Sequence, residues 1–321
     1  MEAATTTATG SPRTGRPGAP AAAAGRVRRA RSGGWGALLW LGPSLVLIAG
    51  VVLYPAYKLA QASFSRFSIT GLYQGSAGPR NYTTLLHQDA LPTVLLTTLV
   101  WVVSVVAVTI VISLGLAQFL NKRFAGRRMV RWALIVPWAA SLIMTSRLFV
   151  WIYDYYFGIL NRFLQWLHVI DAPRDWLADE ATIMPAMIAV GVFVSLPFTT
   201  YVFLAGLQAI PTDILEAAKI DGASGSRTYR SLTLPLLRPA LLVAVVLNMI
   251  YVFNSFPIIW TLNDRNPGFS HDTTITFMYK IAFRSAFRDV GMSAAMSVLN
   301  VLLILVAVMV YLRTVRWKEE D

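Results

Sequence analysis

Long apolar runs alternate with short polar stretches along most of this chain. A run of about 20 apolar residues is long enough to cross the hydrocarbon core of a bilayer as a helix. Six such runs are predicted as membrane spans, at residues 37–60, 93–119, 132–152, 183–209, 239–261 and 290–312. The runs are continuous, and over that length in lipid only a helix satisfies its own backbone. The pattern therefore predicts an all-α polytopic membrane protein with six transmembrane helices.

The polar ends of the chain are predicted to be tails. Residues 1–34 are rich in Ala, Gly, Pro, Thr and Arg and have no apolar period, which predicts a disordered basic tail. Residues 35–312 form the predicted transmembrane domain, and 313–321 a short C-terminal tail. The first apolar run is too long to be the apolar region of a cleaved secretory signal.

Charge is scarce but strongly patterned. Of 321 residues 56% are hydrophobic and 14% charged, whereas a soluble domain has about a quarter of charged residues. Most of the 28 basic residues lie in both tails and in the loops after the second and fourth runs, which share one side of the membrane if there are six spans. The positive-inside rule therefore predicts that both termini are cytoplasmic. For the arginines of the N-terminal tail, this placement favours attraction to anionic lipid over nucleic-acid binding.

Several kinds of chemistry are absent from the sequence. There is no cysteine, and the three histidines, His87, His168 and His271, are too far apart in sequence to suggest metal ligation. No phosphate-binding G-x-x-x-x-G-K-[ST] motif occurs, so ATP hydrolysis is not expected on this chain. No carboxylate lies within a predicted span, which argues against a membrane-embedded enzyme. We expect no cofactor and no metal.

The polar stretch LEAAKIDGASGSRTYRSLTLP, at residues 215–235, stands between two apolar runs. Pro211 is placed to break the preceding span, and Asp213 with Glu216 has the spacing of a helix N-cap and capping box. Gly222 is placed to end the helix in the left-handed conformation.

A second short helix is predicted to follow, with Ser224 or Ser226 as its cap, and Pro235 is expected to end or kink it near Leu234. Small residues in this stretch leave room for another surface to approach closely. By itself the pattern fits either a docking element or an ordinary interfacial loop, because capping signals recur in many proteins.

This stretch resembles the EAA motif of ABC importer permease subunits. Leu232 replaces the usual Ile but remains apolar. The resemblance implies that residues 211–237, here called the coupling loop, insert into a groove on a separate ATP-binding-cassette ATPase. The residues that carry it are Glu216, Ala217, Ala218, Asp221, Gly222, Leu232, Leu234 and Pro235.

The rest of the chain is similar to the first permease of carbohydrate importers of the maltose, trehalose and glycerol-3-phosphate type. The similar stretches are LYPAYKLAQASFS, PRNYTTLL, RWALIVPWAAS, FGILNRFL and FNSFPIIWTL. The resemblance implies a non-catalytic permease subunit in a bacterial cell membrane, which moves a sugar inward by alternating access. It also implies a second permease of like fold and an extracytoplasmic sugar-binding protein as partners, and it does not identify the sugar.

The fifth run carries polar residues that a sugar path would need. Asn248, Tyr251 and Ser255 follow helical i, i+3, i+7 spacing, and Asn254 lies on an adjoining stripe. These four residues are the predicted substrate path, and the alternative is that they are polar contacts between helices. A single-chain secondary transporter of a small polar solute is the rival function, although no charged relay runs through the spans.

Other polar residues in the spans have structural explanations. Ser195, Thr199 and Thr200 flank Pro197 and are expected to bond the carbonyls that it frees. Arg147 lies near the outer end of its run and is expected to reach the interface.

Two outer loops, 61–92 and 262–289, are long enough to offer a surface to a partner. The stretch FMYKIAFRSAFRD in the second loop is predicted to form a helix lying at the membrane surface. LNDRNPGFSHDTT departs from the Gly-rich turn of similar permeases, so the shape of the 262–289 loop is not predicted.

Overall fold

The computed structural model describes residues 34–264, 266, 268–284 and 288–316. Most of the predicted N-terminal tail therefore lies outside the described residues, as does the end of the C-terminal tail. The chain divides into two compact units, residues 1–53 and 54–321. In the first unit the described residues form helix α1 (Gly34–Leu47), which continues into a π-helical segment, η1 (Ile48–Leu53).

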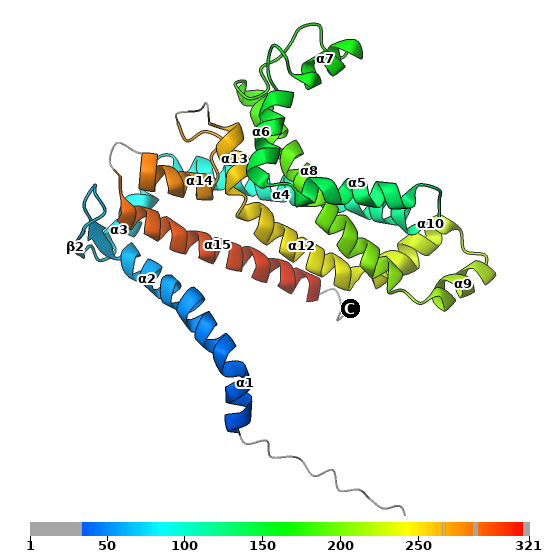
Figure 1. The fold of residues 1–321 in the computed structure, drawn as a ribbon, viewed down its shortest axis with the longest axis horizontal. Coiled ribbons are helices and arrows are strands. Elements are labelled where there is room, and N and C mark those ends of the chain that lie inside the picture. Colours follow the sequence, from blue (N-terminus) through cyan, green and yellow to red (C-terminus); the bar gives the residue numbers. More distant parts are fainter. Residues whose placement is uncertain (1–33, 265, 267, 285–287, 317–321) are drawn as a thin grey trace, which may run out of the picture. The chain divides into compact units, whose positions relative to one another are not determined.

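The second unit is almost entirely helical (Figure 1). Its elements are α2 (Tyr54–Ser63), β1 (Ser65–Phe67), β2 (Tyr73–Ser76), α3 (Arg80–Leu86), α4 (Leu91–Asn121), α5 (Arg127–Ala139), α6 (Leu142–Ile152), α7 (Ile159–Trp166), α8 (Glu180–Gln208), α9 (Thr212–Ile220), α10 (Gly225–Thr228), η2 (Tyr229–Thr233), α11 (Leu234–Leu236), α12 (Arg238–Phe253), α13 (Phe256–Leu262), α14 (Thr274–Tyr279), η3 (Lys280–Arg284) and α15 (Val290–Arg316).

Within the described residues, four helices are long and apolar enough to cross a membrane, and the number rises to six if each of two bent pairs is one span. The four are Leu39–Ser63, Leu91–Asn121, Glu180–Gln208 and Val290–Val315. The helical fold class is thus confirmed. Five of the six predicted spans correspond to these four helices and to the pair formed by α5 and α6, whereas the second bent pair, Gly225–Leu236 with Arg238–Phe253, covers only the first part of the predicted fifth span and includes part of the coupling loop.

The predicted third span is broken. It consists of α5 and α6, which meet at an angle of 101°. Pro137 lies in the last turn of α5, and Ala140 and Ser141 then take extended backbone conformations. Proline lacks the N–H that would continue the helical bonds, so the apolar run does not remain one straight helix.

The predicted fifth span, 239–261, is also divided. Helix α12 ends at Phe253, and α13 begins at Phe256 with Pro257 in its first turn. Because Pro257 has no N–H to donate, it cannot bond to the carbonyl of Phe253 four residues earlier. A proline inside an apolar run therefore marks a helix break here as well.

Helix α4 packs along α8, and α12 lies against both, while α15 lies beside α2 and α3 (Figure 1). The largest core cluster joins α4, α8, α12 and α13 around the buried side chains of Trp101, Met187 and Ile259. Gly191 lets α8 approach the Trp101 ring closely, since a Cβ there would lie 2.6 Å from Trp101 Cη2.

The first outer loop is folded. Strands β1 and β2 pair antiparallel, and α3 follows them. Asn81 on α3 fixes the hairpin, because its side-chain Nδ2 donates to the carbonyls of Ser63 and Ser65 at 2.8 and 2.9 Å.

The stretch in the second outer loop is helical as predicted, but its apolar face is not free to lie on lipid, and its position at the membrane surface stays a prediction. Phe277 and Ile281 are 1% and 3% exposed, and they pack against Met292 and Met296. Lys280, which follows in the same helical stretch, is also buried. Phe287 lies outside the described residues. The helix instead contributes to a core with α15, which its local apolar pattern does not distinguish from a lipid-facing surface.

Candidate functional site

The coupling loop begins with α9, whose N-cap position is occupied by Pro211. The predicted cap at Asp213 is therefore wrong, and α9 has no side-chain cap bond. Asp213 lies in the first helical turn, where its negative charge still interacts favourably with the helix dipole. Proline at the cap fixes an extended entry and leaves one fewer N–H to satisfy.

The predicted role of Gly222 is confirmed by its positive φ of 76°. Two backbone bonds close the turn around it: the N–H of Ala223 donates to the carbonyl of Ala218 at 2.9 Å, and the N–H of Gly222 to that of Lys219 at 3.1 Å. This pair of bonds is the Schellman motif, which needs a left-handed residue after the helix end.

Ser224 caps the second helix, since its Oγ accepts a bond from the N–H of Arg227. The helix does not end near Leu234, and the predicted kink lies slightly later, at Leu237. Helix α10 continues through η2 and α11, and the chain bends by 64° between this run and α12. Pro235 stands near the end of this continuous run, and the bend comes just after it, at Leu237, before α12 begins.

A groove of about 530 Å³ lies between the two helices of the coupling loop. Four of the predicted coupling residues line it: Ala217, Ala218, Asp221 and Leu232. Glu216 is exposed but does not line this groove. Ala223, one of the small residues expected to leave room for another surface, also lines it, whereas Ile214, Arg227, Thr228 and Ser231 were not predicted.

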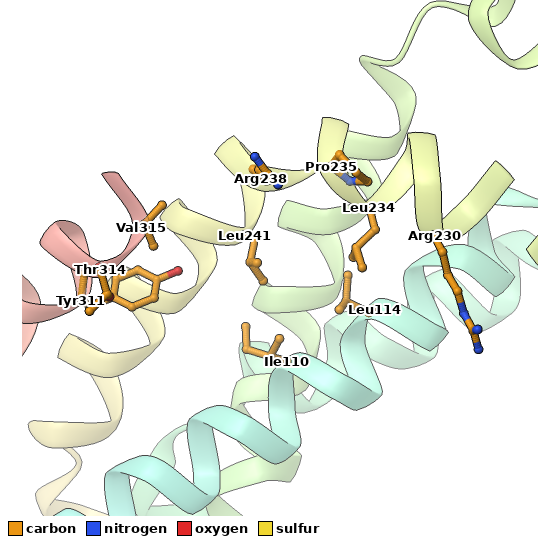
Figure 2. Close-up of a pocket in the computed structure, with 10 residues that line it drawn as sticks. All are labelled: Ile110, Leu114, Arg230, Leu234, Pro235, Arg238, Leu241, Tyr311, Thr314 and Val315. Atoms are coloured by element: carbon orange, nitrogen blue, oxygen red, sulfur yellow. The ribbon is translucent and has the colours of Figure 1, made fainter. Parts of the chain in front are cut away.

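Pro235 belongs to a different cavity, of about 700 Å³, where the coupling loop meets the long helices (Figure 2). Figure 2 shows that α4 contributes Ile110 and Leu114 to it and that α15 contributes Tyr311. The lining is mostly apolar. Space beside α11 means that this segment is packed on only part of its surface.

The coupling loop is firmly attached at its two ends. Leu237 is 1% exposed and belongs to a core cluster with Leu207 and Ile210. A Cβ on Gly206 would lie 2.7 Å from Ala240 Cβ and 2.9 Å from Leu237 Cδ2. The end of α8 and the start of α12 are therefore in direct contact where the loop begins and ends.

A second candidate site is a cavity of about 270 Å³ between α5, α8 and α12. Two predicted substrate-path residues, Asn248 and Tyr251, line it, and two do not. Asn254 is exposed and donates to the carbonyl of Ile250 on its own helix, while Ser255 is buried elsewhere. The other lining residues are Trp138, Val194, Ser195, Phe198 and Leu247.

Two buried polar atoms border this cavity without a hydrogen-bond partner. Asn248 is 2% exposed and donates to Thr199 Oγ1 at 3.4 Å, but its Oδ1 accepts no bond among the described residues. Ser195 Oγ likewise has no partner there. Buried polar atoms are nearly always paired, so these two indicate a place for water or a ligand.

The predicted role of the hydroxyls around Pro197 is largely wrong. Thr199 donates to the carbonyl of Ser195, whereas the carbonyl that Pro197 frees is that of Phe193. Thr200 Oγ1, like Ser195 Oγ, has no partner among the described residues. Arg147 is exposed, and its predicted reach to the membrane interface stays a prediction.

Chemically, the cavity combines aromatic faces with hydrogen-bonding groups and carries no Asp, Glu, His or Lys in its lining. Such a lining suits a neutral polar solute. Over the described part of the chain, no group of three or more His, Cys, Asp or Glu side chains gathers where it could hold a metal ion.

The sequence profile of the family described as "Binding-protein-dependent transport system inner membrane component" matches residues 109–317, which include the coupling loop and the cavity between α5, α8 and α12. The chain belongs to this family. It is a multi-pass inner-membrane permease subunit of an ABC transporter, as the resemblance in its sequence predicted.

Individual relatives agree with this assignment. A probable ABC transporter permease protein of Brucella suis biovar 1 is 39% identical over 274 residues, which cover 84% of this chain and 93% of the relative. The trehalose/maltose transport system permease protein MalF of Thermococcus litoralis is 36% identical over 215 residues, or 67% and 71% of the two chains. The fold is similar to a chain of a bacterial ABC transporter involved in alginate import, with a TM-score of 0.76 and 20% identity over 88% of this chain and 95% of that one.

Proposed function

We propose that this permease subunit translocates a sugar into the cytoplasm. The observation that carries the proposal is the cavity at Asn248, Ser195 and Tyr251, where unpaired polar atoms lie beside aromatic rings. A sugar gives up water when it enters a protein, so it needs replacement hydrogen bonds and apolar ring faces. The trehalose and maltose named for the Thermococcus litoralis relative are solutes of this chemistry.

The driving force comes from a separate ATPase subunit, which docks on the coupling loop. The groove of the coupling loop is lined by the small side chains of Ala217 and Ala218. A protruding side chain of the ATPase therefore fits between α9 and α10. Most basic residues flank the spans on the side of this loop, and by the positive-inside rule this supports a cytoplasmic loop and cytoplasmic termini.

Movement of the loop reaches the cavity through rigid contacts. The loop enters from α8 and leaves into α12, and these helices meet where Gly206 touches Ala240 and Leu237. Ser195 and Asn248 stand on the same two helices, farther into the membrane. A shift of the loop therefore changes the two helices that form the cavity, which is what alternating access requires.

Three further partners complete the transporter: a second permease of like fold, an extracytoplasmic sugar-binding protein and the lipid bilayer. The chain itself carries out no catalytic step. Its part is to supply half of a path and to convert movement of the ATPase into opening and closing of that path.

The experiment that tests this function is purification of the tagged chain from its native membrane, with quantification of the subunits that accompany it. Glu216→Lys reverses an exposed charge on α9, so we expect it to lose the ATPase and ATP-driven sugar uptake while the second permease remains. Asp171→Lys makes a comparable charge reversal at an exposed position far along the chain from the coupling loop and is the control, which keeps both. Sugar movement in liposomes by the wild-type chain alone, without ATP, would overturn the proposal in favour of a secondary transporter.

A further inference from the structure

Four arginines surround one cavity of about 620 Å³ between the end of α4 and the start of α5. They are Arg123, Arg127, Arg128 and Arg131, and the lining contains no carboxylate. Among the residues that the structure describes, no carboxylate lies within ion-pair distance of any of the four. Four positive charges around one hollow repel one another unless an anion or solvent compensates them.

The fold holds this cluster in place. Gly126 takes a positive φ of 86°, which turns the chain sharply between α4 and α5. Phe124 is anchored by its ring contact with Phe119, with centroids 4.6 Å apart. Arg131 Nη2 donates to the carbonyl of Leu120 at 3.4 Å, while its Nε is buried without a partner. The cluster is thus attached to the folded helices on both sides of the turn.

An exposed apolar strip continues from the cluster along α5. Met129, Trp132 and Val136 follow helical spacing on one face and are 76%, 59% and 66% exposed. A cationic hollow next to an apolar strip at the end of a span matches a molecule with an anionic head and an apolar tail. A free anion or an acidic protein surface has no apolar tail that would cover the strip.

We propose that this cavity binds the headgroup of an anionic phospholipid of the cytoplasmic leaflet, with an acyl chain along Met129, Trp132 and Val136. The arginine guanidinium groups donate hydrogen bonds to the phosphate, a pairing that suits arginine because its donors form a planar fork. The inference rests on the cytoplasmic orientation given under the proposed function, and it assigns a ligand to a part of the chain outside the sugar path.

Arg123 and Arg128 are the residues to change, because both are exposed and no hydrogen bond within the described residues depends on them. The test is native mass spectrometry of the transporter complex in a neutral detergent. Dioleoyl phosphatidylglycerol, phosphatidylcholine with the same acyl chains, and inorganic phosphate are titrated separately and in competition.

The expected result is that the wild type binds phosphatidylglycerol more tightly than phosphatidylcholine and that Arg123→Gln/Arg128→Gln weakens the phosphatidylglycerol complex by roughly tenfold. Trp132→Gln weakens the same complex through the apolar strip. The matched control is Arg162→Gln/Arg174→Gln, which removes two exposed arginines beyond the other end of the α5–α6 pair and leaves lipid binding unchanged.

Three results would overturn the inference. Equal binding of phosphatidylcholine removes the role of charge, and full competition by inorganic phosphate means that the cavity takes a free anion. Loss of the ATPase subunit from Arg123→Gln/Arg128→Gln, with lipid binding unchanged, means that the arginines face a protein. The titration requires neither ATP nor sugar, so its failure is distinguishable from failure of the proposed function.

Discussion

The indole Nε1 of Trp101 donates a hydrogen bond of 3.0 Å to the backbone carbonyl of Val252. Trp101 is 1% exposed on α4, and Val252 lies in the last turn of α12. The carbonyls of a last helical turn lack partners in the regular helical ladder. That of Val252 accepts a bond from the N–H of Ser255 at 3.1 Å, and the buried Trp101 donor adds a second bond at the helix end. Trp101 therefore fixes the point at which the fifth apolar run divides into α12 and α13.

The space under Trp101 gives a first prediction. Gly191→Ala would place a Cβ 2.6 Å from Trp101 Cη2, so the ring must shift, which disturbs its hydrogen bond to Val252. We expect a loss of about 1–3 kcal/mol in stability, the usual cost of overpacking a core. The measurement is the thermal unfolding midpoint in detergent. Gly115→Ala on α4, whose Cβ would meet nothing within 4 Å, is the control and leaves the midpoint unchanged or higher.

A second prediction concerns the turn at Gly222. Gly222→Val puts a β-branched residue at a φ of 76°, which costs about 1–2 kcal/mol and opens the Schellman turn. Because α9 then loses its orientation, we expect less ATPase to accompany the purified permease and slower ATP-driven uptake.

Gly225→Ala is the matched control for Gly222→Val, since Gly225 has an ordinary φ and its Cβ would meet nothing within 4 Å. An equal loss of ATPase from both variants would show that the left-handed turn is not what orients the loop.

Local patterns predicted several features of this fold and of its sites. The helix stop at Gly222 and the cap at Ser224 were correct, because each depends on a few neighbouring residues and on a backbone preference. Asn248 and Tyr251 were placed on one path by helical spacing alone, and both line the cavity.

The remaining features depend on contacts between distant residues. Trp138 lies in the last turn of α5, before the break from α6, and lines the cavity with Asn248. The two residues are far apart in sequence, so no local sequence pattern connects them. The same limit applies to Phe277: an apolar residue facing lipid and one facing α15 look alike in a sequence. Ser255 has the spacing of a path residue, but the break after Phe253 takes it off the helix.

Asn248 supplies a third prediction, in which stability and transport move in opposite directions. Asn248→Leu keeps the approximate size of the side chain and removes the buried, unpaired Oδ1 atom. We expect stability to be unchanged or higher, because an unpaired buried polar atom costs about 1–3 kcal/mol. Sugar uptake falls, chiefly through a higher KM, because the solute loses a hydrogen-bond partner.

The control for Asn248→Leu is Asn254→Leu, which changes an exposed residue that bonds only to its own helix. Uptake by this variant stays close to wild type. If Asn248→Leu were less stable and transported normally, Asn248 would be a structural contact between helices, the alternative that its spacing left open.

The outer loop before α14 gives a fourth prediction, through the buried ion pair of Lys280 and Asp272. Lys280 Nζ lies 2.6 Å from Asp272 Oδ2, and the two side chains are 8% and 2% exposed. Lys280 also donates to the carbonyl of Gly268 at 2.7 Å. Lys280→Met leaves a buried carboxylate without its cation, and we expect a loss of roughly 3–5 kcal/mol. Asp272→Asn/Lys280→Met removes both charges and loses less.

The pH dependence of these two variants separates charge from packing. Burial raises the pKa of the Asp272 carboxyl, while the hydrogen bond and positive charge of Lys280 lower it. An acid whose pKa is higher in the folded state than in the unfolded state stabilises the fold at low pH, and that stability is lost as pH rises through the folded-state pKa.

Without Lys280 the carboxyl pKa rises further, so the defect of Lys280→Met is expected to be smaller at about pH 5 than at about pH 8. The double variant has no carboxyl at this position, so its own unfolding midpoint carries no contribution from this titration. Unfolding midpoints that shift equally with pH in both variants would mean that Lys280 supports the loop through its bond to Gly268 and not through the charge of Asp272.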